Sequence, residues 1–222
     1  MRGAELLAWL AALPPDDRDR AVEEHLHLAD RAHASSAPGE HLVGYHASGV
    51  APIVRAVLEI PIVAEDVFVD LGSGLGKVVR LVELLTGARA RGVEVQGALV
   101  DHARDAAARD GSDVAFTHAD ARDAALDDGT VFFMYTPFTG HALADVTERL
   151  LAVAERRAIV VCCLGFDLDR HAPSLVRRDF DAFWLSVYDS VVADVPPRPR
   201  TARSILAGAA ADAVALGRAL SR

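Results

Sequence analysis

The chain has 222 residues, of which 51% are hydrophobic and 25% charged, and its formal net charge is −9 at pH 7. A disordered chain would be less hydrophobic at this charge, and a disulfide-rich scaffold would need more than the two adjacent cysteines, Cys162 and Cys163. The acidic balance provides no general attraction for phosphate backbones, so it argues against nucleic acid as a partner. The length suits one domain with an elaboration.

Residues 1–44 have a helical pattern and lie outside the alternating pattern that follows. Asp16 or Asp17 is suited to cap a helix that runs to about Ala34, before Ser, Pro and Gly residues end it. We expect this helical extension to act as a lid over a site or as a contact between two copies in a homodimer.

No targeting or membrane segment is evident in the sequence. The short apolar N-terminus carries Glu5 and runs into Pro14 and Pro15, which is not the pattern of a signal peptide. No apolar run is long enough to cross a bilayer. Because free cysteines are typical of a reducing compartment, these features together predict a cytoplasmic protein without a membrane partner.

From Val50 onward, strand patterns alternate with helix patterns. We expect strands at 67–70, 90–94, 114–117, 131–135 and 158–164, and helices at about 51–58, 76–85, 97–109 and 140–154. Such alternation with short connections predicts an α/β fold, in which a doubly wound, mostly parallel sheet carries helices on both faces. Residues 174–195 look like a further hairpin, and the alanine-rich tail predicts a helix over about 203–220.

The most informative stretch is the glycine loop Asp70-Leu71-Gly72-Ser73-Gly74-Leu75-Gly76-Lys77, which follows the first strand and opens a helix. Open parallel sheets bind ligands at this end of their strands. The dinucleotide fingerprint needs a glycine where this chain has Lys77 or Val79. The Walker phosphate loop needs a glycine at Leu71 and a hydroxyl at Val78. Neither pattern fits.

The remaining pattern, D-x-G-x-G-x-G after a strand, resembles motif I of the class I S-adenosylmethionine-dependent methyltransferases. The resemblance continues at the next three strand ends, with Glu94, Asp120 and the motif IV stretch Tyr135-Thr136-Pro137-Phe138. It covers residues 45–165 and implies a seven-stranded Rossmann-like domain over 45–222, with S-adenosylmethionine as cofactor. The upstream segment Gly44–Val50 and the V-D-L-G-S-G loop look similar to those of seven-stranded protein lysine methyltransferases.

The resemblance also implies roles for single residues. The carboxylate of Glu94 would accept from the two ribose hydroxyls, because a carboxylate has acceptor sites only. Val95 would pack on adenine, while Asp120 and the Ala121 backbone would contact the base edge. Asp70 would support the loop and the methionine amino group. The other expected cofactor-binding residues lie in the upstream segment, the loop and motif IV: Tyr45, Ser48, Gly72, Ser73, Gly74, Gly76, Tyr135 and Thr136. Two of these have structural alternatives, since Ser48 also fits a helix N-cap and Tyr45 a core aromatic.

Methyl transfer from a sulfonium needs alignment more than a nucleophile or a metal. His46 and His141 are the general-base candidates, although each also fits an exposed or capping histidine. No metal site is expected, because His25 and His27 point to different faces of a helix.

Motif IV bears on the acceptor. Thr136 and a single proline depart from the Asn/Asp-Pro-Pro-Tyr/Phe motif of amino-methylating nucleic-acid enzymes, which argues against transfer to a base. The leading expectation is a methyltransferase that acts on a small molecule or a protein side chain. The alternatives are an enzyme like the propylamine transferases, which share this fold, and a non-catalytic module that binds S-adenosylmethionine.

Overall fold

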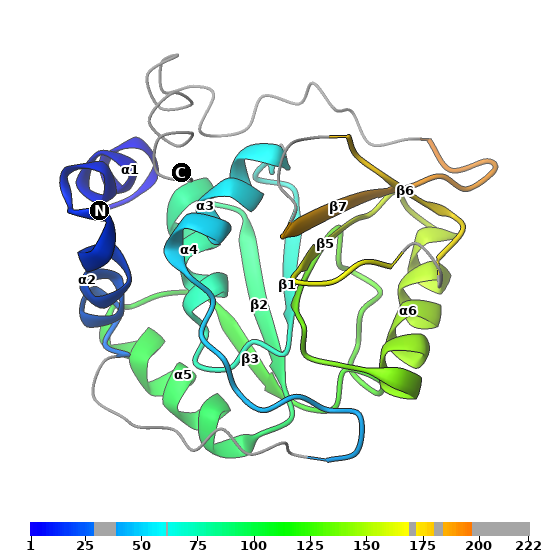
Figure 1. Cartoon of the computed structure of the whole chain (residues 1–222), viewed down its shortest axis with the longest axis horizontal. Coiled ribbons are helices and arrows are strands. Elements are labelled where there is room, and N and C mark those ends of the chain that lie inside the picture. The colour runs from blue at the N-terminus through cyan, green and yellow to red at the C-terminus, as the bar shows by residue number, and fades with distance from the viewer. Residues whose placement is uncertain (29–38, 61, 169–171, 180–183, 197–222) are drawn as a thin grey trace.

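The computed structural model describes residues 1–28, 39–60, 62–168, 172–179 and 184–196. Within these residues one sheet of seven strands has the order β3-β2-β1-β4-β5-β7-β6 (Figure 1). The strands are β1 (Val67–Leu71), β2 (Arg89–Glu94), β3 (Ala115–His118), β4 (Val131–Tyr135), β5 (Val160–Leu164), β6 (Leu175–Arg177) and β7 (Leu185–Ser190). Strands β1 to β5 are parallel, and β7 runs antiparallel to both β5 and β6. The mostly parallel sheet and the terminal hairpin are confirmed.

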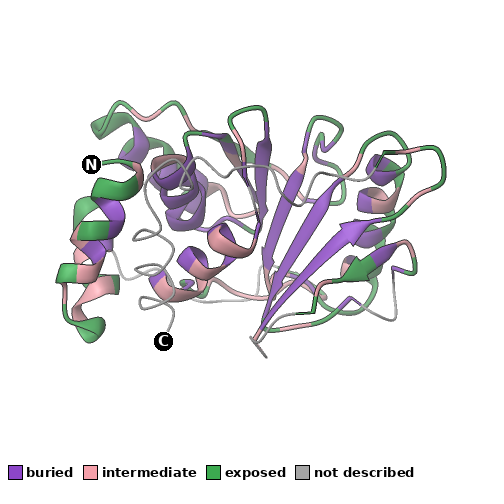
Figure 2. Cartoon of the chain, turned by 90° about the horizontal axis from the view of Figure 1, so that it is seen from above, coloured by how far each residue is buried: buried purple, intermediate pink, exposed green. Residues whose placement is uncertain are grey.

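Helices cover both faces of the sheet, as expected. In the described part of the chain they are α1 (Gly3–Ala12), α2 (Arg18–His25), α3 (Val50–Glu59), α4 (Lys77–Thr86), α5 (Gly97–Arg109) and α6 (Gly140–Ala154), with a 3-10 turn η1 (Pro15–Asp17). One buried cluster joins the sheet to α3, α4 and α5, and a second joins it to α6. Figure 2 shows the buried sheet between these layers. Helices α1 and α2 form an outer layer, since α1 packs on α4 and α2 on α3.

Local sequence explains most of these elements. Strands β1 and β5 are buried along their whole length, as their apolar residues require in a sheet that is covered on both faces, and Asp70 in β1 is their one charged residue. Cys162 and Cys163 are free and buried in β5, and burial raises the pKa of the Cys162 thiol, so both belong to the core. Gly87 ends α4 in the left-handed conformation at φ 70°.

Four expectations about helices and their ends need correction or fall outside the described residues. The helix expected to reach Ala34 ends at His25, and His27 has a positive φ of 57°, which breaks the helical backbone. Ser48 is not the N-cap of α3, because the N-cap is Gly49. Asp17 is the N-cap of α2, but its side chain makes no capping hydrogen bond. The helix expected over 203–220 lies outside the described residues.

No helix in the described ranges combines the length and the apolar composition that crossing a bilayer requires.

Candidate active site

A cleft opens at the carboxyl ends of β1, β2 and β4, under a segment that we call the strap (residues 39–49). The strap connects to α3 and crosses the end of the sheet where the glycine loop lies (Figure 1). The lining residues come from the strap, the glycine loop, the ends of β2 and β4 and the loop after β3: Leu42, Val43, Gly44, Tyr45, His46, Ala47, Ser48, Asp70, Gly72, Ser73, Lys77, Val78, Val93, Glu94, Val95, Gln96, Ala119, Asp120, Ala121, Tyr135, Thr136, Pro137 and Phe138.

The three glycines of the loop have positive φ values of 87°, 52° and 81°, and each lies against a different part of the chain. A Cβ at Gly72 would lie 2.5 Å from Cβ of Pro137 in motif IV. At Gly74 it would lie 2.4 Å from the Tyr45 ring of the strap. At Gly76 it would lie 2.3 Å from the Phe116 ring of β3. Glycine is therefore required here for close packing as well as for backbone conformation.

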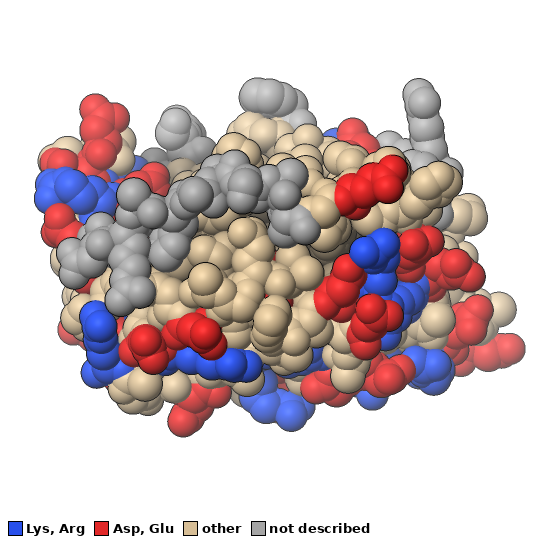
Figure 3. Space-filling model, turned by 90° about the horizontal axis from the view of Figure 1, so that it is seen from below, with Lys and Arg blue, Asp and Glu red and all other residues tan. Residues whose placement is uncertain are grey.

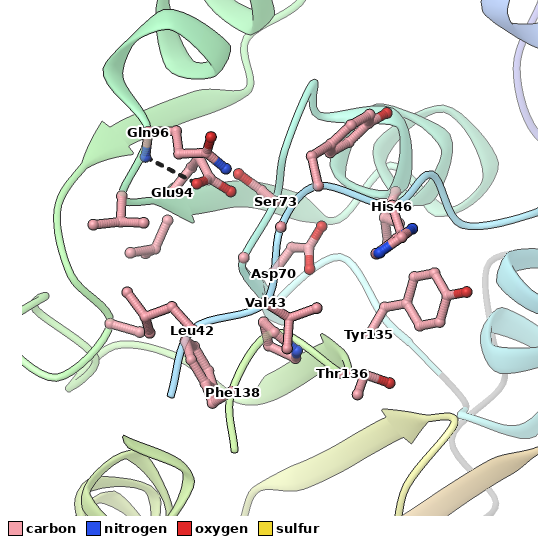
Figure 4. Close-up of a pocket in the computed structure, with 18 of the residues that line it drawn as sticks. Leu42, Val43, His46, Asp70, Ser73, Glu94, Gln96, Tyr135, Thr136 and Phe138 are labelled. Carbon is pink, nitrogen blue, oxygen red and sulfur yellow. Dashed lines mark hydrogen bonds between the residues drawn. The ribbon is translucent and has the colours of Figure 1, made fainter. Parts of the chain in front are cut away.

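Glu94 holds the glycine loop in place. Its side chain is buried at the end of β2, and Oε2 accepts a hydrogen bond of 2.9 Å from the Gly74 N–H. Oε1 accepts another of 2.9 Å from the Gln96 N–H, which Figure 4 shows as a dashed line. Because the two oxygens of a carboxylate have about four acceptor positions, Glu94 retains capacity for two ligand hydroxyls.

Asp70 and Ser73 bring polar groups to the cleft without protein partners. Asp70 is 2% exposed, points into the cleft in Figure 4, and accepts no hydrogen bond from the described residues. Burial, and then the charge of Glu94, raise its pKa well above the usual value. The Ser73 hydroxyl is buried and has no hydrogen-bond partner among the described residues. A ligand with a cationic group and further hydrogen-bonding atoms would satisfy both side chains.

The strap places an aromatic ring over the glycine loop. Tyr45 packs its ring against Gly74, and burial, followed by the charges of Glu23 and Glu94, raises its pKa to about 12. Its phenol therefore stays neutral at physiological pH. Ser48, also buried, lines the same cleft.

On the other side of Glu94, Val95, Asp120 and Ala121 line the cleft together. Arg122 binds the Asp120 carboxylate through Nε at 3.0 Å and Nη2 at 2.7 Å, and its backbone N–H donates to Oδ1 at 2.8 Å. These contacts lower the pKa of Asp120. An amine that binds this carboxylate would share it with Arg122.

Tyr135, Thr136 and His46 lie at the opposite part of the cleft from Gln96 (Figure 4). Thr136 has a positive φ of 42°, and its hydroxyl donates to the Leu164 carbonyl at 3.0 Å. His141 is not among the residues that line the cleft, and its ring meets the edge of the His41 ring at a centroid distance of 5.6 Å. The structure thus brings only one of the two expected general-base candidates to the cleft.

Comparison with known proteins shows which domain the chain carries. Residues 68–160 match a family model described as a methyltransferase domain. An RNA methyltransferase from Salinibacter ruber, solved in complex with S-adenosyl-L-homocysteine, is 29% identical with a TM-score of 0.51, and the match covers 68% of this chain and 97% of that one. The domain match and this relative identify the chain as an S-adenosylmethionine-dependent methyltransferase with a Rossmann-like fold.

Another structural relative of this methyltransferase shows the fold alone. A putative RNA methyltransferase from Pyrococcus horikoshii is 16% identical with a TM-score of 0.54, and the match covers 80% of this chain and 98% of that one. No curated protein matches the sequence. The similarity to protein lysine methyltransferases stays a prediction.

The cleft of this methyltransferase fits S-adenosylmethionine. The buried Asp70 carboxylate suits the amino group of the methionine part, and Glu94 has acceptor capacity for the ribose hydroxyls. The glycine loop brings its backbone to the cleft without Cβ atoms. The comparisons confirm the Rossmann-like fold and the cofactor, whereas the contacts of single residues with the cofactor stay predictions.

Two residues that line the cleft were not expected there from the sequence. Gln96 lines the cleft, and its N–H orients Glu94. Lys77 is buried at the start of α4. The position of Gln96, two residues after the strand-end acid Glu94, is a usable signal, but nothing local to Lys77 predicts its burial.

Proposed function

We propose that this methyltransferase transfers the methyl group to a small molecule or a protein side chain that enters beside Tyr135, Thr136 and His46. The observation that carries the proposal is the chemistry of motif IV. Enzymes that methylate base amines resemble one another in an Asn or Asp at this position, whose carbonyl oxygen accepts from the amine. Here the position is Thr136, and its hydroxyl is already bound to the Leu164 carbonyl. A base amine would find no side-chain carbonyl there.

The charges of the cleft support the same acceptor class. Three carboxylates line it, on Asp70, Glu94 and Asp120, and its one lysine is paired with two carboxylates of α2. Figure 3 shows the face that carries the strap, and its middle is largely uncharged, with both signs of charge around it. A polyanionic acceptor needs clustered Lys and Arg side chains instead.

The residues of the chain would orient the reaction and keep water out. When bound, S-adenosylmethionine supplies a methyl group that its sulfonium already activates. Asp70 and the glycine loop would fix the methionine part, and the strap would close the cleft to water. His46 lines the cleft and is the candidate to take a proton from the acceptor.

RNA is the second candidate acceptor, favoured by one observation: the Salinibacter ruber relative, 29% identical, is named an RNA methyltransferase. The deciding experiment incubates the protein with methyl-labelled S-adenosylmethionine and, separately, total RNA, total protein and a small-metabolite extract. We expect label in the protein or the metabolite pool.

Glu94→Ala, which removes an expected cofactor contact, serves as the control for background labelling. Nuclease-sensitive label in the RNA pool would contradict the proposal. No label in any pool, with cofactor binding intact, would instead favour the non-catalytic module.

A further inference from the structure

The N-terminal extension binds one polar face of α4, the helix that the glycine loop opens. Lys77, Arg80 and Glu83 are three residues apart, so they lie along one side of this helix. Each binds the extension: Lys77 pairs with Asp19 and Glu23 of α2, Arg80 donates to the Leu26 carbonyl, and Glu83 pairs with Arg2. The extension therefore docks on α4, whose first residues, Lys77 and Val78, line the cofactor cleft.

Asp19 makes the contacts that reach furthest into the site. A single oxygen, Oδ1, accepts from the Val50 N–H at 3.0 Å and from the Lys77 ammonium at 3.2 Å. Val50 is the first residue of α3, and Lys77 is the first residue of α4. The N-cap residue of α3, Gly49, makes no side-chain hydrogen bond. Asp19, from a different helix, therefore supplies the acceptor that caps the first N–H of α3.

The Lys77 ammonium depends on these acids. Its side chain is 5% exposed, and the second carboxylate, of Glu23, lies 2.7 Å away. A buried ammonium is costly unless it is paired. The ammonium of this first residue of α4, directly after Gly76, is thus paired with carboxylates of α2 and is largely shielded from solvent.

The two helix starts that Asp19 joins flank the cofactor cleft. The strap runs directly into α3, and the glycine loop runs directly into α4, with the Tyr45 ring packed on Gly74 between them. The other end of the strap is fixed to motif IV, where the Val43 N–H donates to the Pro137 carbonyl at 3.0 Å. Asp19 is accordingly the second anchor of the strap.

We infer that Asp19 is a positioning residue for cofactor binding, which sets the strap against the glycine loop without touching the cofactor. Its carboxylate fixes the distance between Val50, the first residue after the strap, and Lys77, the last residue of the glycine loop. Loss of the carboxylate would release one end of the strap and leave Lys77 with a single partner. The inference rests on S-adenosylmethionine being the cofactor.

The test compares Asp19→Ala with Glu24→Ala. Glu24 lies on the same helix and is exposed, and it pairs with Arg20 rather than with the strap or α4. We expect Asp19→Ala to raise the Kd for S-adenosyl-L-homocysteine by about tenfold, measured by calorimetry, and Glu24→Ala to change it by less than about twofold. Amide hydrogen exchange in residues 39–49 of the ligand-free protein should accelerate in Asp19→Ala only.

Asp19→Asn provides a milder variant in case the alanine variant does not fold. Its amide oxygen still accepts from the Val50 N–H but carries no charge for Lys77, so we expect a Kd between those of the native protein and Asp19→Ala. A native Kd in the Asp19 variants would overturn the inference, and so would reduced thermal stability without a change in Kd. Failure of the native protein to bind S-adenosyl-L-homocysteine would be a different result, because it would overturn the cofactor assignment itself.

Discussion

The two halves of the cleft differ in how tightly the chain fixes them. In the cofactor half, the glycines at 72, 74 and 76 each pack against another element, and Glu94 holds the loop through the Gly74 N–H. In the proposed acceptor half, Tyr135 and His46 line the cleft, and the Thr136 hydroxyl donates to the Leu164 carbonyl; the cofactor contacts that the sequence predicts for Tyr135 and Thr136 stay predictions. The chain thus fixes the glycine loop with many contacts and presents fewer polar groups in the half of the cleft where we propose that the acceptor enters. This difference suits a reaction that depends on alignment.

The largest effect is expected from Gly72→Ala. The new Cβ would meet Cβ of Pro137 at 2.5 Å, in a backbone with φ of 87°, so both packing and conformation oppose it. We expect the free energy of unfolding to fall by roughly 2–5 kcal/mol, measured by denaturant unfolding, with loss of cofactor binding.

Gly111→Ala is the matched control, because Gly111 has a φ of 62° but nothing within 4 Å of its Cβ position. It should cost only the backbone preference, roughly 1–2 kcal/mol. Equal losses in the two variants would show that motif IV does not pack tightly against the loop. The cofactor half would then not be more tightly fixed than the acceptor half.

Glu94→Ala comes next. It removes the acceptor of both the Gly74 and the Gln96 N–H and the expected contact with the ribose. We expect binding of S-adenosylmethionine to weaken by about 1–3 kcal/mol in calorimetry. Tyr135→Phe, in the acceptor half, should leave the affinity within about twofold. An unchanged affinity in Glu94→Ala would mean that the ribose binds elsewhere.

The sequence predicts the local elements and most of the cofactor half, but it does not predict contacts between distant segments. The apolar runs and helical periodicities predict β4, α5 and α6 with the bounds that the structure shows, because these elements depend on local pattern. The acids at strand ends reach the cleft because parallel strands end at one edge of the sheet. Local pattern therefore suffices for most of the fold and for most of the cofactor half.

Contacts between distant segments account for the rest. Ser48 is a reasonable N-cap from its sequence, but the cap of α3 comes from Asp19 of another helix. The burial of Lys77 likewise depends on two acids of α2, and no local pattern encodes them. His141 follows motif IV closely, yet α6 carries it away from the cleft and toward His41.

The pH dependence of stability tests Asp70. Its native pKa is raised, so the folded state holds the proton more tightly than the unfolded state does. Stability of the ligand-free protein should therefore fall as the pH rises from the usual carboxyl range toward the native pKa. Asp70→Asn should remove this fall. The exposed Asp101→Asn should keep it.

Thermal unfolding between about pH 4 and pH 8 measures this dependence. Bound S-adenosylmethionine should reduce the fall in the native protein, because its amino group favours the carboxylate and lowers the pKa. If Asp70→Asn keeps the native pH profile, Asp70 is not the group that titrates.

The smallest effect is expected at Thr136, in the acceptor half. Thr136→Ala loses the hydrogen bond to Leu164 and keeps the unfavourable φ of 42°, whereas Thr136→Gly loses the bond but relieves the backbone. We expect Thr136→Gly to be more stable than Thr136→Ala by about 1 kcal/mol in denaturant unfolding. Both should bind S-adenosyl-L-homocysteine within about twofold of the native protein, because the hydroxyl already donates to the Leu164 carbonyl. A tenfold loss of affinity in Thr136→Ala would assign Thr136 to the cofactor half. The residues at the end of β4 would then belong to the cofactor half as well.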